Sequence, residues 1–244
     1  MAPQAFPSGA LLLFALPVGV IVLFRARWFS GGLKVLYGFT RMVLQLTLLG
    51  YVLVYLFSAR HPYPVLAALG VMLSASAWIA LHPLQKKGLH LFARALAAIF
   101  LGAGGTLALA LFGVLSLSPW WNPRYLLPLA GMTFYGALNG LSLAAERFFS
   151  ARSMGASPEE ARNQAYRAAL IPYLNSLFSA GLVSIPGMMT GQILAGVSPL
   201  VAVKYQILIM LMIFSSAGLS ALFFLFFVVK GESRKEERDD RRAD

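Results

Sequence analysis

The chain has 244 residues, of which 59% are hydrophobic and none is cysteine, and its mean hydropathy is +0.73. These values indicate a polytopic membrane protein and exclude a soluble domain, a disulfide framework and thiolate metal sites. The net charge of +11 is interpreted as a membrane-topology and anionic-lipid signal, so the lipid bilayer is the expected partner and no nucleic acid is expected.

Seven apolar stretches approach or exceed the roughly 20 residues that a helix needs to cross a bilayer. No basic residue precedes the first stretch and no cleavage pattern follows it, so it is interpreted as a retained span. We therefore predict an all-α polytopic membrane protein with about seven transmembrane helices in a domain at 1–229, followed by a charged cytoplasmic tail at 230–244. In chain order the stretches are 9–24, 42–58, 64–82, 95–117, 125–146, 170–196 and 205–229.

The basic residues predict the orientation of these spans. Nearly all of the 20 Lys and Arg residues lie either in the tail or in one set of alternate loops, which includes Lys86 and Lys87. The other set holds only Arg60, Arg124 and Lys204. Because Lys and Arg concentrate in cytoplasmic loops, we expect the N-terminus outside, the C-terminus in the cytoplasm, and residues 147–169 in a cytoplasmic loop.

The distribution of acidic residues disfavours several classes of membrane protein. The first acidic residue is Glu146, and all nine lie from there onward, in the last cytoplasmic loop or the tail. Proton- and sodium-coupled carriers commonly use buried carboxylates, so a self-powered secondary carrier is disfavoured. A serine hydrolase is also disfavoured, because Ser184 has no histidine or lysine nearby in sequence. The chain has no G-x-x-x-x-G-K-[ST] motif to bind ATP, so active transport would need another polypeptide.

The loop at 147–169 carries the signals of a helix, a sharp turn and a second helix. Gly155 suits the left-handed conformation that ends a helix. In "SPEE", Ser157 is the expected N-cap, Pro158 suits the first helical position, and Glu160 completes an S-x-x-E capping box. This preformed element is either a docking site for a partner or an ordinary structured connection, and the residues alone leave both open.

The stretch "GLVSIPGMMTGQILAG", residues 181–196, is rich in residues that weaken helices. We expect it to complete one kinked span at 170–196, broken near the proline and covered by protein or water, because lipid does not tolerate unpaired backbone groups. Two interpretations remain open, a translocation pathway or close helix packing. For the amides of Gln45, Asn139, Asn175 and Gln206, an interhelical hydrogen bond is favoured over a contact with substrate, which stays open as the alternative. The candidate pathway residues are Ser184, Pro186, Gly187, Met188, Thr190, Gly191 and Gln192.

The run "RAALIPYLNSLFSAGLVSIPGMMTGQILAGVSPLVAVKYQILIM", residues 167–210, resembles the C-terminal signature of the FetB family of iron-export ABC transporter permeases, which is related to a plant aluminium-tolerance membrane subunit. "TRMVLQLTLLGYVLVYLF" at 40–57, "LPLAGM" at 127–132 and "ALNGLSLAAERF" at 137–148 support the resemblance. It implies a bacterial inner-membrane permease, two copies of which pair with two cytoplasmic ATP-binding subunits of the FetA kind. ATP and magnesium would then bind the partner, and this chain would bind no cofactor and would not itself be an enzyme.

In this family the turn at Gly155 would be the coupling element that receives the ATPase stroke. It resembles the E-A-A and glycine loop of many ABC permeases, although "FSARSMG" keeps the glycine and not the acid. The family also tends to have Gly-Asn where this chain has Tyr135 and Gly136.

The resemblance suggests iron as substrate, but the spans hold no His, Asp, Glu or Cys cluster. The metal site is therefore unknown, and passage of a complexed metal or of a different solute stays open, as does a membrane scaffold or assembly factor.

Overall fold

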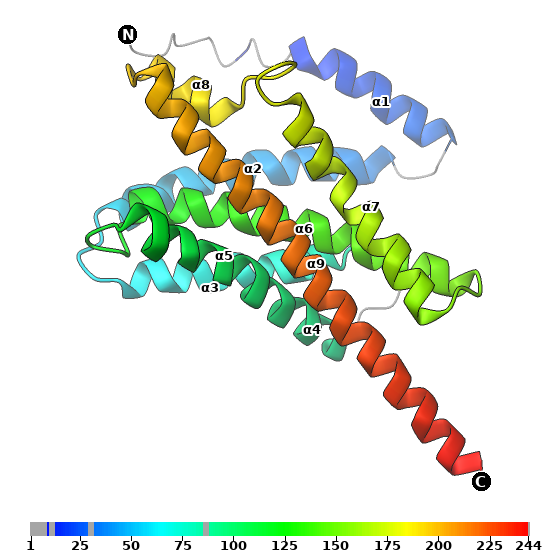
Figure 1. The fold of residues 1–244 in the computed structure, drawn as a ribbon. Helices are drawn as coiled ribbons and strands as arrows, with labels where there is room; N and C mark the ends of the chain where they lie inside the picture. The colour runs from blue at the N-terminus through cyan, green and yellow to red at the C-terminus, as the bar shows by residue number, and fades with distance from the viewer. Residues whose placement is uncertain (1–8, 10–12, 29–31, 85–87, 244) are drawn as a thin grey trace. The chain divides into compact units, whose positions relative to one another are not determined.

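The computed structural model describes residue 9 and residues 13–28, 32–84 and 88–243 of the chain. Within these residues the regular structure is helical, with one isolated β-bridge (Figure 1). The chain divides into two compact units, 1–60 and 61–244. Lys86 and Lys87, which enter the predicted charge pattern, lie outside the described residues, as do residues 10–12 of the first expected span.

The first unit contains α1 (Ala15–Trp28) and α2 (Gly32–Phe57), which contact each other. In α2 the hydroxyls of Thr40 and Thr47 donate to the carbonyls of Leu36 and Val43, at 3.1 and 2.9 Å. These bonds satisfy the two threonine hydroxyls within the helix itself. The helix is therefore suited to a hydrocarbon environment.

The second unit contains the remaining helices, two of which have the wider π-helical hydrogen bonding. In chain order they are α3 (Tyr63–Ala80), α4 (Leu89–Ile99), the π-helix η2 (Phe100–Gly104), α5 (Gly105–Ala108), the π-helix η3 (Leu109–Leu115), α6 (Pro123–Ser153), α7 (Pro158–Ser179), α8 (Gly187–Leu194) and α9 (Pro199–Ala243).

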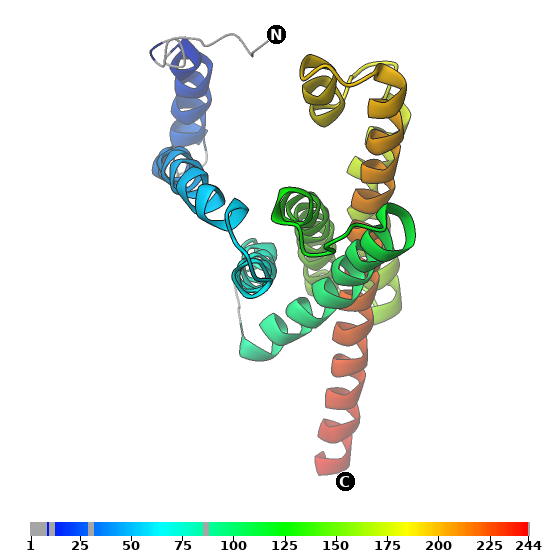
Figure 2. The ribbon, with the colours of Figure 1, turned by 90° about the vertical axis from the view of Figure 1, so that its left-hand side faces the viewer.

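Helix α9 is the central element of this unit, since it contacts α4, η2, α6, α7 and α8 (Figures 1 and 2). Small residues bring it close to its neighbours. A Cβ added to Gly140 of α6 would lie 2.9 Å from the carbonyl oxygen of Ala217 and 3.0 Å from its Cα, and one added to Gly136 would lie 2.9 Å from the hydroxyl of Ser216. A Cβ on Gly102 would lie 2.5 Å from the backbone nitrogen of Ser220. The glycines let the backbones approach as in other membrane helix pairs.

Five helical segments in the described part of the chain are long and apolar enough to cross a membrane. The shorter apolar helix at Ala15–Phe24 lies within the first expected span. The number seven and the orientation of the termini remain predictions. The five segments are Val35–Phe57, Tyr63–Ala80, Leu89–Leu115, Pro123–Ser153 and Pro199–Gly231.

The break expected near Pro186 is present, but the prediction of a single kinked helix at 170–196 was wrong. Helix α7 ends at Ser179, a non-helical turn follows, and the short α8 begins only after Pro186. Gly181 adopts a left-handed φ of +80° and its N–H donates to the Ser184 carbonyl at 2.9 Å. The proline therefore does not kink a continuous helix. The chain has already turned before it, and Pro186 precedes the first turn of a new helix, where a missing N–H does no harm.

Candidate functional site

The connection between α6 and α7 is a tight turn with its backbone groups satisfied. Gly155 has a left-handed φ of +90°. Its N–H donates to the Arg152 carbonyl and the N–H of Ala156 donates to the Ala151 carbonyl, each at 3.1 Å. This pair of bonds is the Schellman motif that closes a helix C-terminus. The guanidinium of Arg152 also donates to the Ala156 carbonyl at 2.8 Å, so the predicted sharp turn is confirmed.

Helix α7 begins with the predicted capping box. The Ser157 hydroxyl accepts from the N–H of Glu160 at 3.3 Å, and the Glu160 carboxylate accepts from the N–H of Ser157 at 3.0 Å. Pro158 occupies the first helical position. The N–H and then the hydroxyl of Ser157 lower the pKa of Glu160 below its ordinary value, because both donate to the ionised carboxylate. The turn and both helix ends are thus fixed by local bonds.

Helices α6 and α7 contact each other behind this turn, and small residues are buried on both; we call these buried faces the alanine seam. The buried residues of this seam, each no more than 1% exposed, are Ala144, Ala145, Phe148, Ala151, Ala161, Ala165 and Ala169. Arg147 of α6 also donates to the Gln164 side chain of α7 at 3.0 Å. The turn itself projects, since Met154 is 68% exposed and Ser157 and Glu160 are exposed. We call residues 144–169 the α6–α7 hairpin; it has a stiff stem and an accessible tip.

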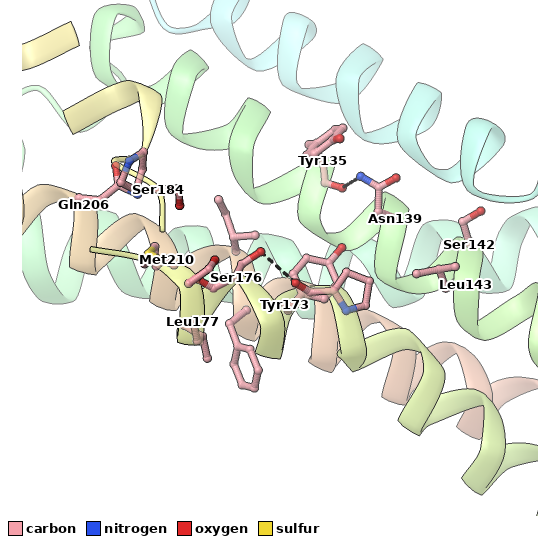
Figure 3. Close-up of a pocket in the computed structure, with 16 residues that line it drawn as sticks. Tyr135, Asn139, Ser142, Leu143, Tyr173, Ser176, Leu177, Ser184, Gln206 and Met210 are labelled. Carbon is pink, nitrogen blue, oxygen red and sulfur yellow. Dashed lines mark hydrogen bonds between the residues drawn. The ribbon is translucent and has the colours of Figure 1, made fainter. Parts of the chain in front are cut away.

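A cleft of about 650 Å³ lies between α6, α7, the turn at 180–186 and α9 (Figure 3). Ser184 and Gln206 lie toward one end of it, and Ser142 and Leu143 toward the other. Its size is that of a small-molecule site. The polar side chains that line it are Tyr135, Asn139, Ser142, Tyr173, Ser176, Ser179, Ser184 and Gln206.

Several of these polar groups bond to helix backbone. The Asn139 amide nitrogen donates to the Tyr135 carbonyl at 3.1 Å, and the Ser176 hydroxyl donates to the Pro172 carbonyl at 2.9 Å (Figure 3). The Tyr173 hydroxyl joins two helices by donating to the Gly136 carbonyl of α6 at 2.7 Å. The amide oxygen of Gln206, in contrast, is buried and accepts no hydrogen bond from the part of the chain that the structure describes.

The cleft brings together only two of the candidate pathway residues, Ser184 and Pro186. The others lie on α8 and are not lining residues. A Cβ added to Gly187 or Gly191 would meet no described atom within 4 Å, so packing against the described part of this chain does not explain these glycines. Thr190 donates to the Pro186 carbonyl at 3.3 Å, and the amide oxygen of Gln192 is buried without a hydrogen-bond partner among the described residues. A pathway role for Gly187, Met188, Thr190, Gly191 and Gln192 stays a prediction.

Sequence reasoning missed much of the cleft wall. Asn139 and Gln206 were expected to bond between helices, but Asn139 bonds within α6, and the oxygen of Gln206 has no partner within the described residues. A usable signal was present in the polar residues spaced three or four apart, because such residues share a helix face. They are Tyr135, Asn139 and Ser142 on α6, and Tyr173, Ser176 and Ser179 on α7. Among the described residues, no group of three or more His, Cys, Asp or Glu could hold a metal ion.

Residues 8–231 match the family described as "Uncharacterised protein family (UPF0014)". The chain belongs to this family. It is 38% identical over 197 residues to a UPF0014 membrane protein of Synechocystis, with 75% of this chain and 76% of the relative covered. It is 35% identical over 206 residues to the "Probable iron export permease protein FetB" of Escherichia coli, with 77% of each covered. No solved structure matches it.

A plant relative extends the range of the family. The chain is 28% identical over 232 residues to the "Protein ALUMINUM SENSITIVE 3" of Arabidopsis thaliana, covering 88% of this chain and 82% of the relative. The resemblance seen in the sequence is thus confirmed at the level of the family. Together with the apolar helices, these relatives identify a multi-pass membrane protein of the bacterial inner-membrane kind.

Proposed function

We propose that the chain is the membrane-spanning permease subunit of an ABC transporter, energised by a separate cytoplasmic ATP-binding subunit. The observation that carries this proposal is the α6–α7 hairpin, with its buried stem and exposed tip. The name of the Escherichia coli relative points the same way. Because the chain has no phosphate-binding loop, ATP and magnesium belong to the partner.

Helix α7 links the hairpin tip to the cleft. It has 22 residues, so it is about 33 Å long. Its first half packs against α6, and Tyr173 and Ser176 in its second half line the cleft. Pro172 lies between the two halves and lacks the N–H that would bond to the Ala168 carbonyl, so α7 bends most easily beside the cleft. A push on the tip by a closing ATPase would thus alter the cleft wall.

The cargo and the assembly are part of the same proposal. We infer a metal in some form as the transported species and export as the direction, because a relative with 35% identity is named an iron export permease. Two copies of the chain with two FetA-type subunits would form the transporter in the inner membrane. The metal is cargo here, which is consistent with the lack of a resident metal-binding cluster among the described residues.

The test is purification of the tagged chain from its own membranes in mild detergent, followed by mass spectrometry and an ATPase assay. We expect a Walker-motif ATPase in near-equal amount. Gly155→Ala should lower the ATPase activity severalfold without preventing membrane insertion, because alanine at a left-handed φ costs roughly 1–2 kcal/mol and displaces the tip. An added Cβ at Gly155 meets no described atom within 4 Å, so strain is the only local effect.

Gly196 provides a matched control. It has a φ of +91°, it ends α8 in the same type of turn with bonds from Gly196 to Ile193 and from Val197 to Gln192, and it also has open space around it. Gly196→Ala should therefore cause the same local strain and leave ATPase coupling unchanged. Recovery of no ATPase from an intact oligomer would instead favour a membrane scaffold, or a self-powered carrier whose flux persists without ATP and collapses with an uncoupler.

A further inference from the structure

The cleft is uncharged throughout. Its polar groups are serine and tyrosine hydroxyls and the amides of Asn139 and Gln206, and the rest of its wall is apolar, including Met210 and Phe214. No Asp, Glu, His, Lys or Arg is among the lining residues, all of which lie in the described part of the chain. The wall thus offers hydrogen bonds and apolar contact but no compensating charge.

The charged residues of the same helices lie beyond the two ends of the cleft. Glu146 and Arg147 follow Leu143 by about one turn of α6, and neither lines the cleft. At the other end, Lys204 precedes Gln206 in α9 and is exposed. These flanking charges, one acidic and two basic, lie outside the wall and therefore provide no counter-charge within it.

An ion gains little from such a wall. A bare metal ion would lose its water without receiving carboxylate, imidazole or thiolate ligands, and a charged complex would enter an apolar wall without a counter-charge. A metal that is already neutralised by its own chelator avoids both costs. Its organic surface can contact the apolar wall, as small-molecule ligands do.

Gln206 adds a specific requirement. Its amide oxygen is buried and accepts no hydrogen bond from the described residues. A buried acceptor of this kind is destabilising unless something donates to it. The oxygen belongs to a residue that lines the cleft, but it has almost no exposed surface itself, so a ligand N–H or O–H in the cleft would supply the missing partner once the Gln206 side chain turns toward it.

We propose that a metal enters this cleft only inside an uncharged complex, whose organic ligands make the contacts and donate a hydrogen bond to Gln206. This rests on the proposed function as a metal-exporting permease and names the form in which the cargo is carried. The metal ion itself contacts no side chain of the cleft.

The test compares three forms of iron on the intact transporter complex in lipid nanodiscs, by equilibrium dialysis with radioactive iron. The first is the neutral Fe(III) complex of a tripodal tris-hydroxamate with amide N–H groups in its arms. The second is an Fe(III) tris-catecholate of similar size, which carries three negative charges. The third is aqueous Fe(II) under anaerobic conditions. We expect the neutral complex to bind at least about tenfold more tightly than either charged form, given the cost of charge in an apolar site.

Two variants at one position test the role of the amide. Gln206→Leu removes the acceptor and should weaken binding of the neutral complex by roughly fivefold, as expected for one hydrogen bond. Gln206→Glu keeps the shape and adds a charge, so it should weaken the neutral complex and strengthen binding of Fe(II). The matched control is Asn175→Leu, which removes an amide of α7 that does not line the cleft. It should leave all three affinities unchanged.

The outcomes separate this inference from the permease proposal. Tight binding of aqueous Fe(II) or of the anionic complex by the unmodified protein would overturn the inference, and this comparison needs no variant to fold. Failure of all three forms of iron to bind a transporter that retains its ATPase would also overturn the inference. The permease proposal would then stand. Failure to recover any ATPase would overturn the permease proposal itself.

Discussion

The two connections at the ends of α7 differ in how they are held. Before α7, the turn at Gly155 is closed by a Schellman motif and a capping box and backed by the buried alanine seam. After α7, the turn at Gly181 leads into α8, which has no side-chain cap and no buried residue. Both use a glycine with a left-handed φ. Only the first is fixed by both local bonds and packing.

This difference suits the two roles proposed for them. A segment that receives force must keep its shape, whereas a segment beside a transport cleft must change conformation during the cycle. The α6–α7 hairpin has the properties of the first and the α7–α8 connection those of the second. Low local stability is typical of elements that move.

The largest expected effect of a single change lies in the packed region behind the hairpin. Gly140→Leu would force a side chain into the backbone of Ala217 in α9, because even a Cβ would lie 2.9 Å from the carbonyl oxygen. We expect destabilisation of about 3 kcal/mol, the upper range for overpacking. The free energy of unfolding of the purified chain in mixed micelles measures this destabilisation.

Gly187→Leu in α8 is the control for this prediction, because an added Cβ there meets no described atom within 4 Å. It should change the free energy of unfolding by about 0.5 kcal/mol or less, as for an open surface site. Equal destabilisation by the two variants would remove the distinction between a packed and an open region.

The same distinction explains how much could be predicted from the sequence. The hairpin was predicted residue by residue, because the Gly155 turn and the Ser157 capping box are signals carried by neighbouring residues. The end of α7 at Ser179 was not predicted, because Pro186 is a stronger local signal for a helix break than Gly181. The break was therefore expected several residues too late in the chain. The cleft combines residues of three helices, so its wall depends on packing that no short stretch specifies.

A smaller effect is expected at the contact that joins α7 to α6 beside the cleft. Tyr173→Phe removes the hydroxyl that donates to the Gly136 carbonyl at 2.7 Å. We expect a loss of about 1 kcal/mol in unfolding free energy, typical of one hydrogen bond, with a change in the coupling of ATP hydrolysis to transport. Tyr135→Phe is the matched control, since Tyr135 is 67% exposed. A loss as large for Tyr135→Phe would assign the effect to the cleft lining in general.

The smallest effect concerns pH and separates the two connections without changing any packing. The pKa of Glu160 is lowered in the folded chain by the bonds from Ser157, so its cap stabilises α7 at pH values above the ordinary Glu value of 4.5. That contribution is lost as the pH falls through the lower, folded pKa, because the protonated carboxyl is the weaker acceptor. Hydrogen exchange at the start of α7 should therefore speed up, relative to the intrinsic rate, as the pH falls below 4.5.

The turn at 180–186 and helix α8 provide the internal reference for this measurement, since residues 180–194 contain no ionisable side chain. Their relative exchange should not follow the same pH dependence. In Glu160→Gln, the start of α7 should exchange faster already at neutral pH and lose its own dependence below 4.5. If the unmodified hairpin showed no acid-dependent loosening while α8 did, the cap would not be what stiffens the hairpin tip, and the alanine seam alone would have to account for its rigidity.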